Sequence, residues 1–131
     1  MTSPTILIVD DDPAVRRVLS RAMGQIGYGV LLATTGEEAC EVLAARHVDL
    51  ILMDLRMPSM SGQTLFHMIR TQWPHLAARV VIMSGDPEAK DHEDWLDLHN
   101  VPVLSKPFGI PQIVDLTRRL TATERREASR Q

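Results

Sequence analysis

Short runs of apolar residues alternate with longer amphipathic stretches along almost the whole chain, and this alternation constrains the fold more than any other feature. Continuous apolar runs of this kind are typical of strands that are buried on both faces of a sheet. The stretches between the runs repeat apolar residues at the spacing of an amphipathic helix. The predicted strands span residues 5–9, 28–33, 50–53, 79–83 and 101–104.

A helix is predicted after each of these strands. The first ends at Gly27, and the last carries Ile110, Ile113 and Leu120 on its apolar face. The weakest helical pattern lies at residues 88–99, which are rich in charged side chains. Because strands that alternate with helices pair in parallel through right-handed crossovers, we expect an α/β fold: a doubly wound five-stranded parallel sheet with five helices.

The length of 131 residues suits a single domain. Helical apolar spacing ends near Thr121, so we expect a domain at residues 1–121 and a polar, Arg-rich tail at residues 122–131. The formal net charge of -3 therefore divides into an acidic body and a basic tail.

Composition and local patterns exclude several classes of protein. Cys40 is the single cysteine, so no internal disulfide can form, as is usual in a reducing compartment. No apolar run reaches the length of a membrane helix, and the start of the chain lacks a signal-peptide pattern. No helix-turn-helix or other DNA-binding motif is recognisable. We therefore expect a cytoplasmic protein that binds neither membrane nor nucleic acid.

Polar side chains follow four of the predicted strands at their carboxyl ends. Aspartates at residues 10–12 follow the first strand, Asp54 the third, Ser84 the fourth and Lys106 the fifth. Ligand sites in open parallel sheets lie beyond the carboxyl ends of the strands. We therefore expect these side chains to converge at one edge of the sheet.

The charges of this cluster do not balance without a cation. Two carboxylates about 4 Å apart repel each other by roughly 4 kcal/mol at an effective dielectric of 20. Lys106 supplies one positive charge, and a Mg²⁺ ion, which prefers oxygen ligands, would supply two more. A partly exposed Asp54 beside such a metal would be placed to attack phosphorus, with Ser84 and Lys106 close to the transferred oxygens.

Each of these residues also has an ordinary structural explanation. Asp12 before Pro13 is typical of a helix N-cap, residues 84–86 would suit a turn, and Lys106 would suit an exposed loop. All of these features at the ends of neighbouring strands favour a functional site over a set of unrelated turns.

Four segments resemble the receiver domain of two-component response regulators. They are ILIVDDDP at residues 6–13, LMDLRMPSMSG at 52–62, VIMSGD at 81–86 and LSKPF at 104–108. The resemblance covers roughly residues 5–120 and implies a flavodoxin-like fold with strand order 2-1-3-4-5.

The resemblance also assigns a metal site and a phosphoacceptor. It implies that Asp54 accepts the phosphoryl group and that Mg²⁺, or Mn²⁺ in its place, is bound beside it. Asp11 would be a direct ligand, Asp10 would act largely through water, and Asp54 and the backbone carbonyl of Arg56 would complete the protein's share of the ligands.

The resemblance further implies roles for residues on the last two strands. Ser84 would donate a hydrogen bond to the phosphoryl group, and Lys106 would pair with it, aided by a cis Lys106–Pro107 peptide bond. The phosphoryl donor would be a histidine kinase or a histidine phosphotransfer protein. The chain would catalyse its own phosphorylation and dephosphorylation without being a turnover enzyme. We hypothesise that Arg56 and Asp86 flank the path of the attacking water and tune the phosphoryl lifetime.

Two departures from the family pattern concern how phosphorylation is sensed. Many receivers carry Tyr or Phe three residues before the lysine, where this chain has Val103. Residues 97–102 lack the common Gly-Ala pair and include a proline. The expected output is a partner that binds the face formed by the fourth strand, the fourth helix and the fifth strand. The chain would be a stand-alone regulator or the receiver of a hybrid histidine kinase.

Two other functions fit part of the pattern. A Mg²⁺-dependent phosphatase of the haloacid dehalogenase type would use an Asp-x-Asp motif, which Asp10 and Asp12 satisfy. In those enzymes the last acidic motif follows the lysine, whereas the acidic residues after Lys106 lie on the predicted helix or tail. A degenerate receiver that binds partners without phosphorylation would explain Val103 but leaves Asp54 without a role.

Overall fold

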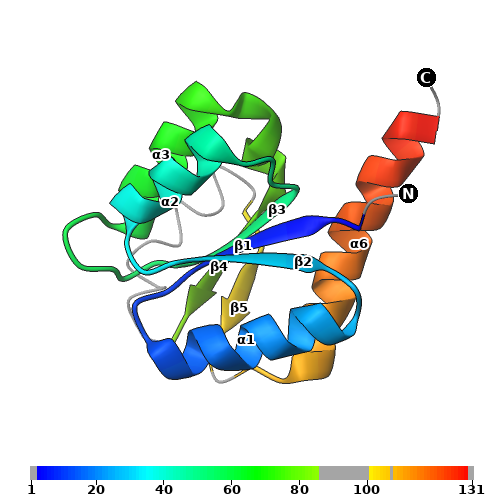
Figure 1. Cartoon of the computed structure of the whole chain (residues 1–131), viewed down its shortest axis with the longest axis horizontal. Helices are drawn as coiled ribbons and strands as arrows, with labels where there is room; N and C mark the ends of the chain where they lie inside the picture. The colour runs from blue at the N-terminus through cyan, green and yellow to red at the C-terminus, as the bar shows by residue number, and fades with distance from the viewer. Residues whose placement is uncertain (1–2, 86–100, 107, 130–131) are drawn as a thin grey trace.

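The computed structural model describes residues 3–85, 101–106 and 108–129, and the side chains of these residues up to Thr121. Its elements follow one another along the chain as the apolar runs predict (Figure 1). They are β1 (Thr5–Val9), α1 (Pro13–Gln25), β2 (Gly29–Ala33), α2 (Gly36–Ala45), β3 (Leu50–Asp54), α3 (Gly62–Gln72), η1 (Pro74–Arg79), β4 (Val80–Ser84), β5 (Val103–Ser105) and α6 (Ile110–Ser129).

The five strands form one sheet in the order β2-β1-β3-β4-β5, and all of its neighbouring strands are parallel. This confirms the predicted fold class and strand order. The register pairs Val9 with Met53 and Ser84 with Ser105, so the carboxyl ends of the strands meet at one edge of the sheet.

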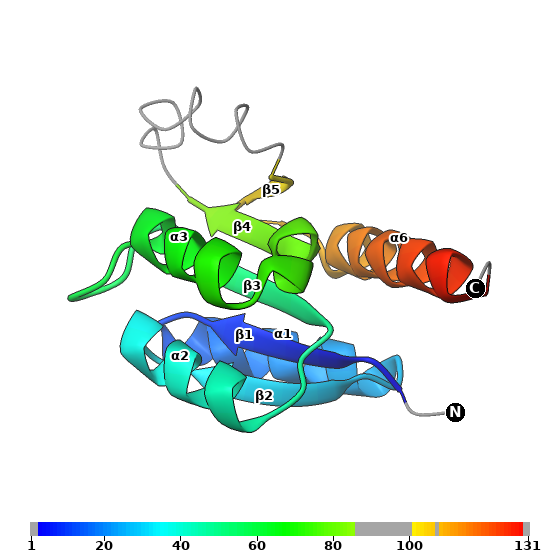
Figure 2. The ribbon, with the colours of Figure 1, turned by 90° about the horizontal axis from the view of Figure 1, so that it is seen from above.

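Helices cover both faces of the sheet, α2 and α3 on one face and α1 with α6 on the other (Figures 1 and 2). Successive strand residues point to opposite faces, and β1 illustrates this. Leu7 and Val9 pack beneath α2 and α3, while Ile6 and Ile8 pack beneath α1 and α6. All four side chains are fully buried. The central strands must therefore be apolar on both faces, as the continuous runs in the sequence indicate.

The structure differs from the sequence-based expectation at two elements. β5 begins at Val103 rather than at residue 101, and the 3₁₀ helix η1 was not predicted. The helix α6 continues to Ser129, so it includes residues 122–129 of the predicted tail. The helix expected at residues 88–99 lies outside the described residues.

Helix α1 begins as its sequence predicts. The side chain of Asp12 accepts a hydrogen bond of 2.9 Å from the backbone N–H of Ala14, and Pro13 takes the first helical position. Within the parts of the chain that the structure describes, no helix is both long and apolar enough to cross a membrane.

Candidate functional site

Asp10 directly follows β1 and is fully buried. Its backbone N–H donates to the carbonyl of Ala33, which continues the pairing of β1 with β2. One carboxylate oxygen, Oδ1, accepts a 2.9 Å hydrogen bond from the N–H of Asp12. The carbonyl oxygen of Asp10 accepts a 2.8 Å hydrogen bond from Nη1 of Arg16 on α1. Three hydrogen bonds thus fix the residue between the sheet and the first helix.

Asp54 is the last residue of β3 and keeps 14% of its side chain exposed. Its Oδ1 accepts a 3.1 Å hydrogen bond from the backbone N–H of Arg56, which turns the chain sharply after the strand. The carboxylate therefore lies at the edge of the sheet, within reach of a solution partner.

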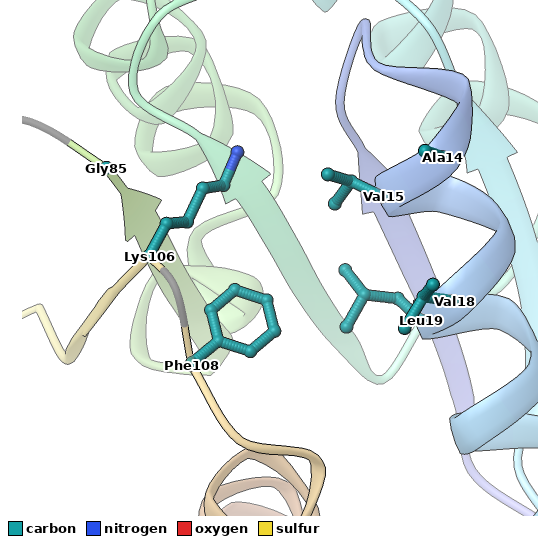
Figure 3. A pocket seen from close by; sticks show the side chains of 7 residues that line it. All are labelled: Ala14, Val15, Val18, Leu19, Gly85, Lys106 and Phe108. Atoms are coloured by element: carbon teal, nitrogen blue, oxygen red, sulfur yellow. The ribbon is translucent and has the colours of Figure 1, made fainter.

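Lys106 joins the two carboxylates. Its Nζ lies 3.0 Å from Oδ2 of Asp10 and 2.9 Å from Oδ2 of Asp54. The backbone N–H of Lys106 donates to the carbonyl of Ser84 at 2.6 Å, so the end of β4 positions the lysine. Figure 3 shows the extended side chain leaving the chain beside Gly85. A Cβ added to Gly85 would lie only 3.2 Å from Cβ of Lys106, so the small residue leaves room for the lysine.

The electrostatics of the three groups are strained. Burial raises the pKa of Asp10, and the charge of Asp54 adds to this effect, although the N–H of Asp12 and Lys106 oppose it. Burial alone would lower the pKa of Lys106, but its hydrogen bonds and charge attraction to Asp54 and Asp10 outweigh burial and raise it. The ammonium group of Lys106 pairs with two carboxylates, which leaves a net negative charge among these three groups that a further cation could offset.

A divalent cation fits the donors that are present. Oxygen atoms of Asp10, Asp11 and Asp54 all lie within 4.8 Å of one another, and Asp11 is exposed. Next to them is a cavity of about 410 Å³ whose walls include Asp11, Arg56 and Ser61. Carboxylate oxygens beside an open space suit Mg²⁺, because the ion keeps several of its own waters when it binds.

The remaining predicted site residues are placed as follows. Ser84 ends β4 at the same edge of the sheet and is 6% exposed. Arg56 follows Asp54 with its side chain exposed, and Val103 on β5 is 38% exposed. Asp86 and Pro107 lie outside the described residues.

Two close contacts around the site were not anticipated from the sequence. One is the hydrogen bond from Arg16 to Asp10. The other is the approach of Gly62, at the start of α3, to the chain after Asp54: an added Cβ would lie 2.8 Å from Cα of Leu55. In the sequence, a glycine at the end of the loop that follows Asp54 is the hint of this approach.

The loop between β3 and α3 is also attached to α2. Ser59 has a positive φ of 63° and donates its hydroxyl to both carboxylate oxygens of Glu37, each at 3.1 Å. The side chain of Met60 lies against Gly36, where an added Cβ would come within 2.5 Å of its Sδ. Helix α2 therefore supports the loop that follows Asp54.

Comparisons with known proteins agree with this geometry. The family model described as the response regulator receiver domain matches residues 6–118. The chain belongs to the response regulator receiver domain family, which is the family that the four sequence segments indicated.

Relatives occur both in sensor kinases and in transcriptional regulators. The chain is 43% identical over 84 residues to the autoinducer 1 sensor kinase/phosphatase LuxN of Vibrio campbellii, covering 64% of this chain and 10% of LuxN. It is 32% identical over 124 residues to the transcriptional regulatory protein KdpE of Mycobacterium tuberculosis, covering 95% of this chain and 52% of KdpE. The chain thus spans a tenth to about half of the length of these relatives.

Among solved structures, the chain is similar to the signal receiver domain of an HD domain-containing protein from Pseudomonas fluorescens Pf-5. The two share 26% sequence identity with a TM-score of 0.86, over 100% of this chain and 96% of the other. The similarity extends over the whole receiver fold, including the sheet edge that carries the site.

Proposed function

We propose that this domain accepts a phosphoryl group on Asp54 from a phosphohistidine of a histidine kinase or phosphotransfer protein, as one step of a phosphorelay. The observation that carries this proposal is the shared ion pair: Lys106 bridges Asp10 and Asp54, with Asp11 beside them. A carboxylate at an open sheet edge, held by a cation and facing a metal site, is suited to attack on phosphorus.

The chain's own residues would orient this transfer. An oxygen of the Asp54 carboxylate forms the new P–O bond while the P–N bond of the phosphohistidine breaks. The ring leaves as neutral imidazole, because it keeps the proton already on its other nitrogen. The N–H of Arg56 holds the other oxygen of Asp54 in place. Lys106 and the hydroxyl of Ser84 neutralise and hydrogen-bond the transferred oxygens.

Asp10, Asp11, Asp54 and the carbonyl of Arg56 would hold Mg²⁺ or Mn²⁺ in this scheme. When bound, the metal offsets the negative charge that gathers between the carboxylates and the incoming phosphoryl group. Support comes from the donor set itself, since three carboxylates outnumber the single lysine.

Hydrolysis of the phosphorylated residue would end the signal. As a hypothesis from their positions in the sequence, two residues beyond Asp54 and Ser84, Arg56 and Asp86 would flank the path of the attacking water. If Arg56→Ala and Asp86→Ala each leave the dephosphorylation rate unchanged, these two residues do not control the phosphoryl lifetime.

The phosphorylated domain would bind its downstream partner through the face of β4, β5 and the intervening residues. Val103 is part of that face and is 38% exposed, so an aliphatic side chain stands at the position where many receivers carry an aromatic ring. Phosphorylation would shift an existing equilibrium toward the form that the partner binds. The domain serves either as a stand-alone regulator or within a hybrid histidine kinase, acts on the cytoplasmic side, and contacts no nucleic acid itself.

Intact mass spectrometry tests the proposal. After incubation with acetyl phosphate and Mg²⁺, the wild-type chain should gain the mass of one phosphoryl group, and Asp54→Asn should gain none. Asp115→Asn, which changes an exposed carboxylate on α6, is the matched control and should react like wild type. A wild-type chain that gains no mass would indicate a degenerate interaction module.

The phosphatase alternative has a separate signature. Steady turnover of p-nitrophenyl phosphate that is lost in Asp10→Asn but retained in Asp54→Asn would show that Asp10 is the nucleophile. We expect no sustained turnover in either variant.

A further inference from the structure

Arg16 is a charged side chain of α1 that the proposed chemistry does not use. It is half-buried, and its Nη1 lies 2.8 Å from the carbonyl oxygen of Asp10. Its own backbone N–H donates to the carbonyl of Asp12 at 3.1 Å. One residue therefore holds both ends of the acidic segment 10–12, one end through its side chain and the other through its backbone.

Among the described residues, Arg16 supplies the hydrogen bond to the carbonyl of Asp10 that a neighbouring strand would otherwise supply. The N–H of Asp10 pairs with Ala33, but β2 ends at Ala33, so no further residue of that strand continues the ladder. A buried carbonyl without a partner costs free energy, and a guanidinium donor satisfies it strongly.

The same carbonyl determines where Asp11 points. It belongs to the planar peptide unit that joins Asp10 to Asp11, so fixing the carbonyl fixes the direction in which the chain leaves Asp10. Asp11 is exposed and has little packing to orient it. Helix α1 is firmly anchored, since Leu19 and Met23 are fully buried. Arg16 thus transmits the rigidity of α1 to a carboxylate at the edge of the site.

We propose that Arg16 is a positioning residue for the metal site, which orients Asp11 for the cation by holding the carbonyl of Asp10. This inference rests on the proposed metal-dependent function. Positioning and simple charge repulsion predict opposite effects of removing Arg16 on metal affinity. A guanidinium near the site repels a cation, so on charge alone its removal would tighten metal binding. If positioning dominates, its removal weakens metal binding.

The test measures binding of Mn²⁺ alone by electron paramagnetic resonance, in wild type and four variants. Arg16→Ala and Arg16→Met remove the donor, and Met keeps the apolar stem. Arg16→Lys retains a charge and one donor. Arg17→Ala removes the same charge from the neighbouring exposed residue of α1 and is the matched control. Thermal unfolding in EDTA checks that each variant folds.

We expect the Kd for Mn²⁺ to rise about tenfold in Arg16→Ala and Arg16→Met, which corresponds to about 1.4 kcal/mol for the loss of a fixed orientation of Asp11. Arg16→Lys should stay within about threefold of wild type, and Arg17→Ala should match wild type. In acetyl phosphate reactions the Mg²⁺ concentration at half-maximal rate should rise by the same factor, while the rate at saturating Mg²⁺ stays within about twofold.

Unchanged or tighter Mn²⁺ binding in Arg16→Ala and Arg16→Met overturns the inference. If Arg16→Ala fails to fold, the comparison of Arg16→Met with Arg16→Lys decides in its place, and equal affinities of those two also overturn it. A wild-type chain that binds Mn²⁺ but accepts no phosphoryl group would instead refute the proposed function and leave the positioning result standing.

Discussion

Asp10 carries a negative charge at a position where the fold would prefer a neutral group. It is fully buried, and its pKa is raised by burial and by the neighbouring Asp54. Sites of this kind commonly trade stability for function. The free energy of unfolding in the absence of metal should therefore measure how much the buried carboxylate destabilises the fold.

Asp10→Asn is expected to stabilise the chain in EDTA by about 1 kcal/mol, because it removes a buried charge and its repulsion of Asp54. Urea unfolding measures the change. Added Mg²⁺ should reduce this difference in the free energy of unfolding, because it stabilises wild type, which binds the metal, more than the variant. Asp115→Asn, at a carboxylate that is 70% exposed, should change stability by less than about 0.5 kcal/mol. A destabilised Asp10→Asn in EDTA would show that its hydrogen bonds outweigh its charge.

Cys40 on α2 provides a second residue-scale prediction. Burial raises the pKa of its thiol, and the charge of Glu37 adds to the effect. Since the thiolate is the reactive form, alkylation by iodoacetamide at pH 8 should be at least several-fold slower than that of a free thiol. Glu37→Gln should make the alkylation of Cys40 slightly faster, because it removes a charge that raises the pKa of the thiol.

The raised pKa of Cys40 also predicts how the stability of the fold depends on pH. The folded state favours the neutral thiol. The contribution of Cys40 to the free energy of unfolding is therefore fully present below the ordinary pKa of about 8.5, and it is lost as the pH rises through the higher pKa of the folded state. Alkylation at pH 8 as fast as that of an unfolded peptide would contradict the shift.

At the scale of elements, the start of α3 is fitted tightly against the end of β3. The N–H of Gly62 donates to the carbonyl of Leu55 at 2.9 Å, and a Cβ on Gly62 would lie 2.9 Å from the carbonyl oxygen of Asp54. Backbone atoms cannot move aside as a flexible side chain does. The distance between α3 and the phosphoacceptor loop therefore depends on this glycine.

Gly62→Ala should destabilise the fold by about 1–3 kcal/mol, since the helix must shift to admit one methyl group. Gly24→Ala, in α1 with no atom within 4 Å of the new Cβ, should stabilise it by about 0.5–1 kcal/mol. Chemical denaturation of both variants measures the difference. Equal effects would mean that α3 adjusts without cost.

The strands were predictable because their signal is continuous apolarity, and the sheet edge followed because parallel strands end together. The 3₁₀ helix at Pro74 was missed, since six residues are too few to show a period. β5 starts two residues later than predicted. The carbonyl of Pro102 still accepts a hydrogen bond from Ile82, but proline has no N–H with which to extend the ladder.

The composition of the site was predictable in the same way, but its hydrogen bonds were not. Asp10, Asp54 and Lys106 converge because of the strand order alone. The hydrogen bonds from Arg16 to Asp10 and from Ser59 to Glu37 depend on side-chain directions that only the folded structure defines. Such contacts leave no periodic pattern in a single sequence.

For the whole molecule, the extent of α6 bears on where the domain ends. The helix continues to Ser129, while the buried side chains that it contributes in the described part of the chain are Ile113, Thr117 and Thr121. The hydroxyl of Tyr28 lies 3.3 Å from that of Thr121, which ties this point of α6 to the start of β2.

A chain that ends at Thr121 should keep its unfolding free energy within about 0.5 kcal/mol of the full chain, because the sequence of residues 122–131 is mostly polar and is not expected to add to the core. A chain that ends at Leu116 should lose at least about 2 kcal/mol, since it lacks both buried threonines. Thermal and urea unfolding of the three lengths compare them. A large loss on removal of residues 122–131 would extend the domain to the end of α6.

The roles assigned to Asp54, Lys106 and the acidic pair all converge on one covalent event. Borohydride reduces an acyl phosphate to an alcohol, so it marks a phosphorylated aspartate permanently as homoserine. The chain should therefore be treated with acetyl phosphate and Mg²⁺, reduced, digested and mapped by tandem mass spectrometry. We predict homoserine at position 54 alone, and none when EDTA replaces Mg²⁺. Reduction at Asp10 or Asp11, or an unmarked chain that had gained phosphoryl mass, would place the phosphoryl group elsewhere and refute the proposed function.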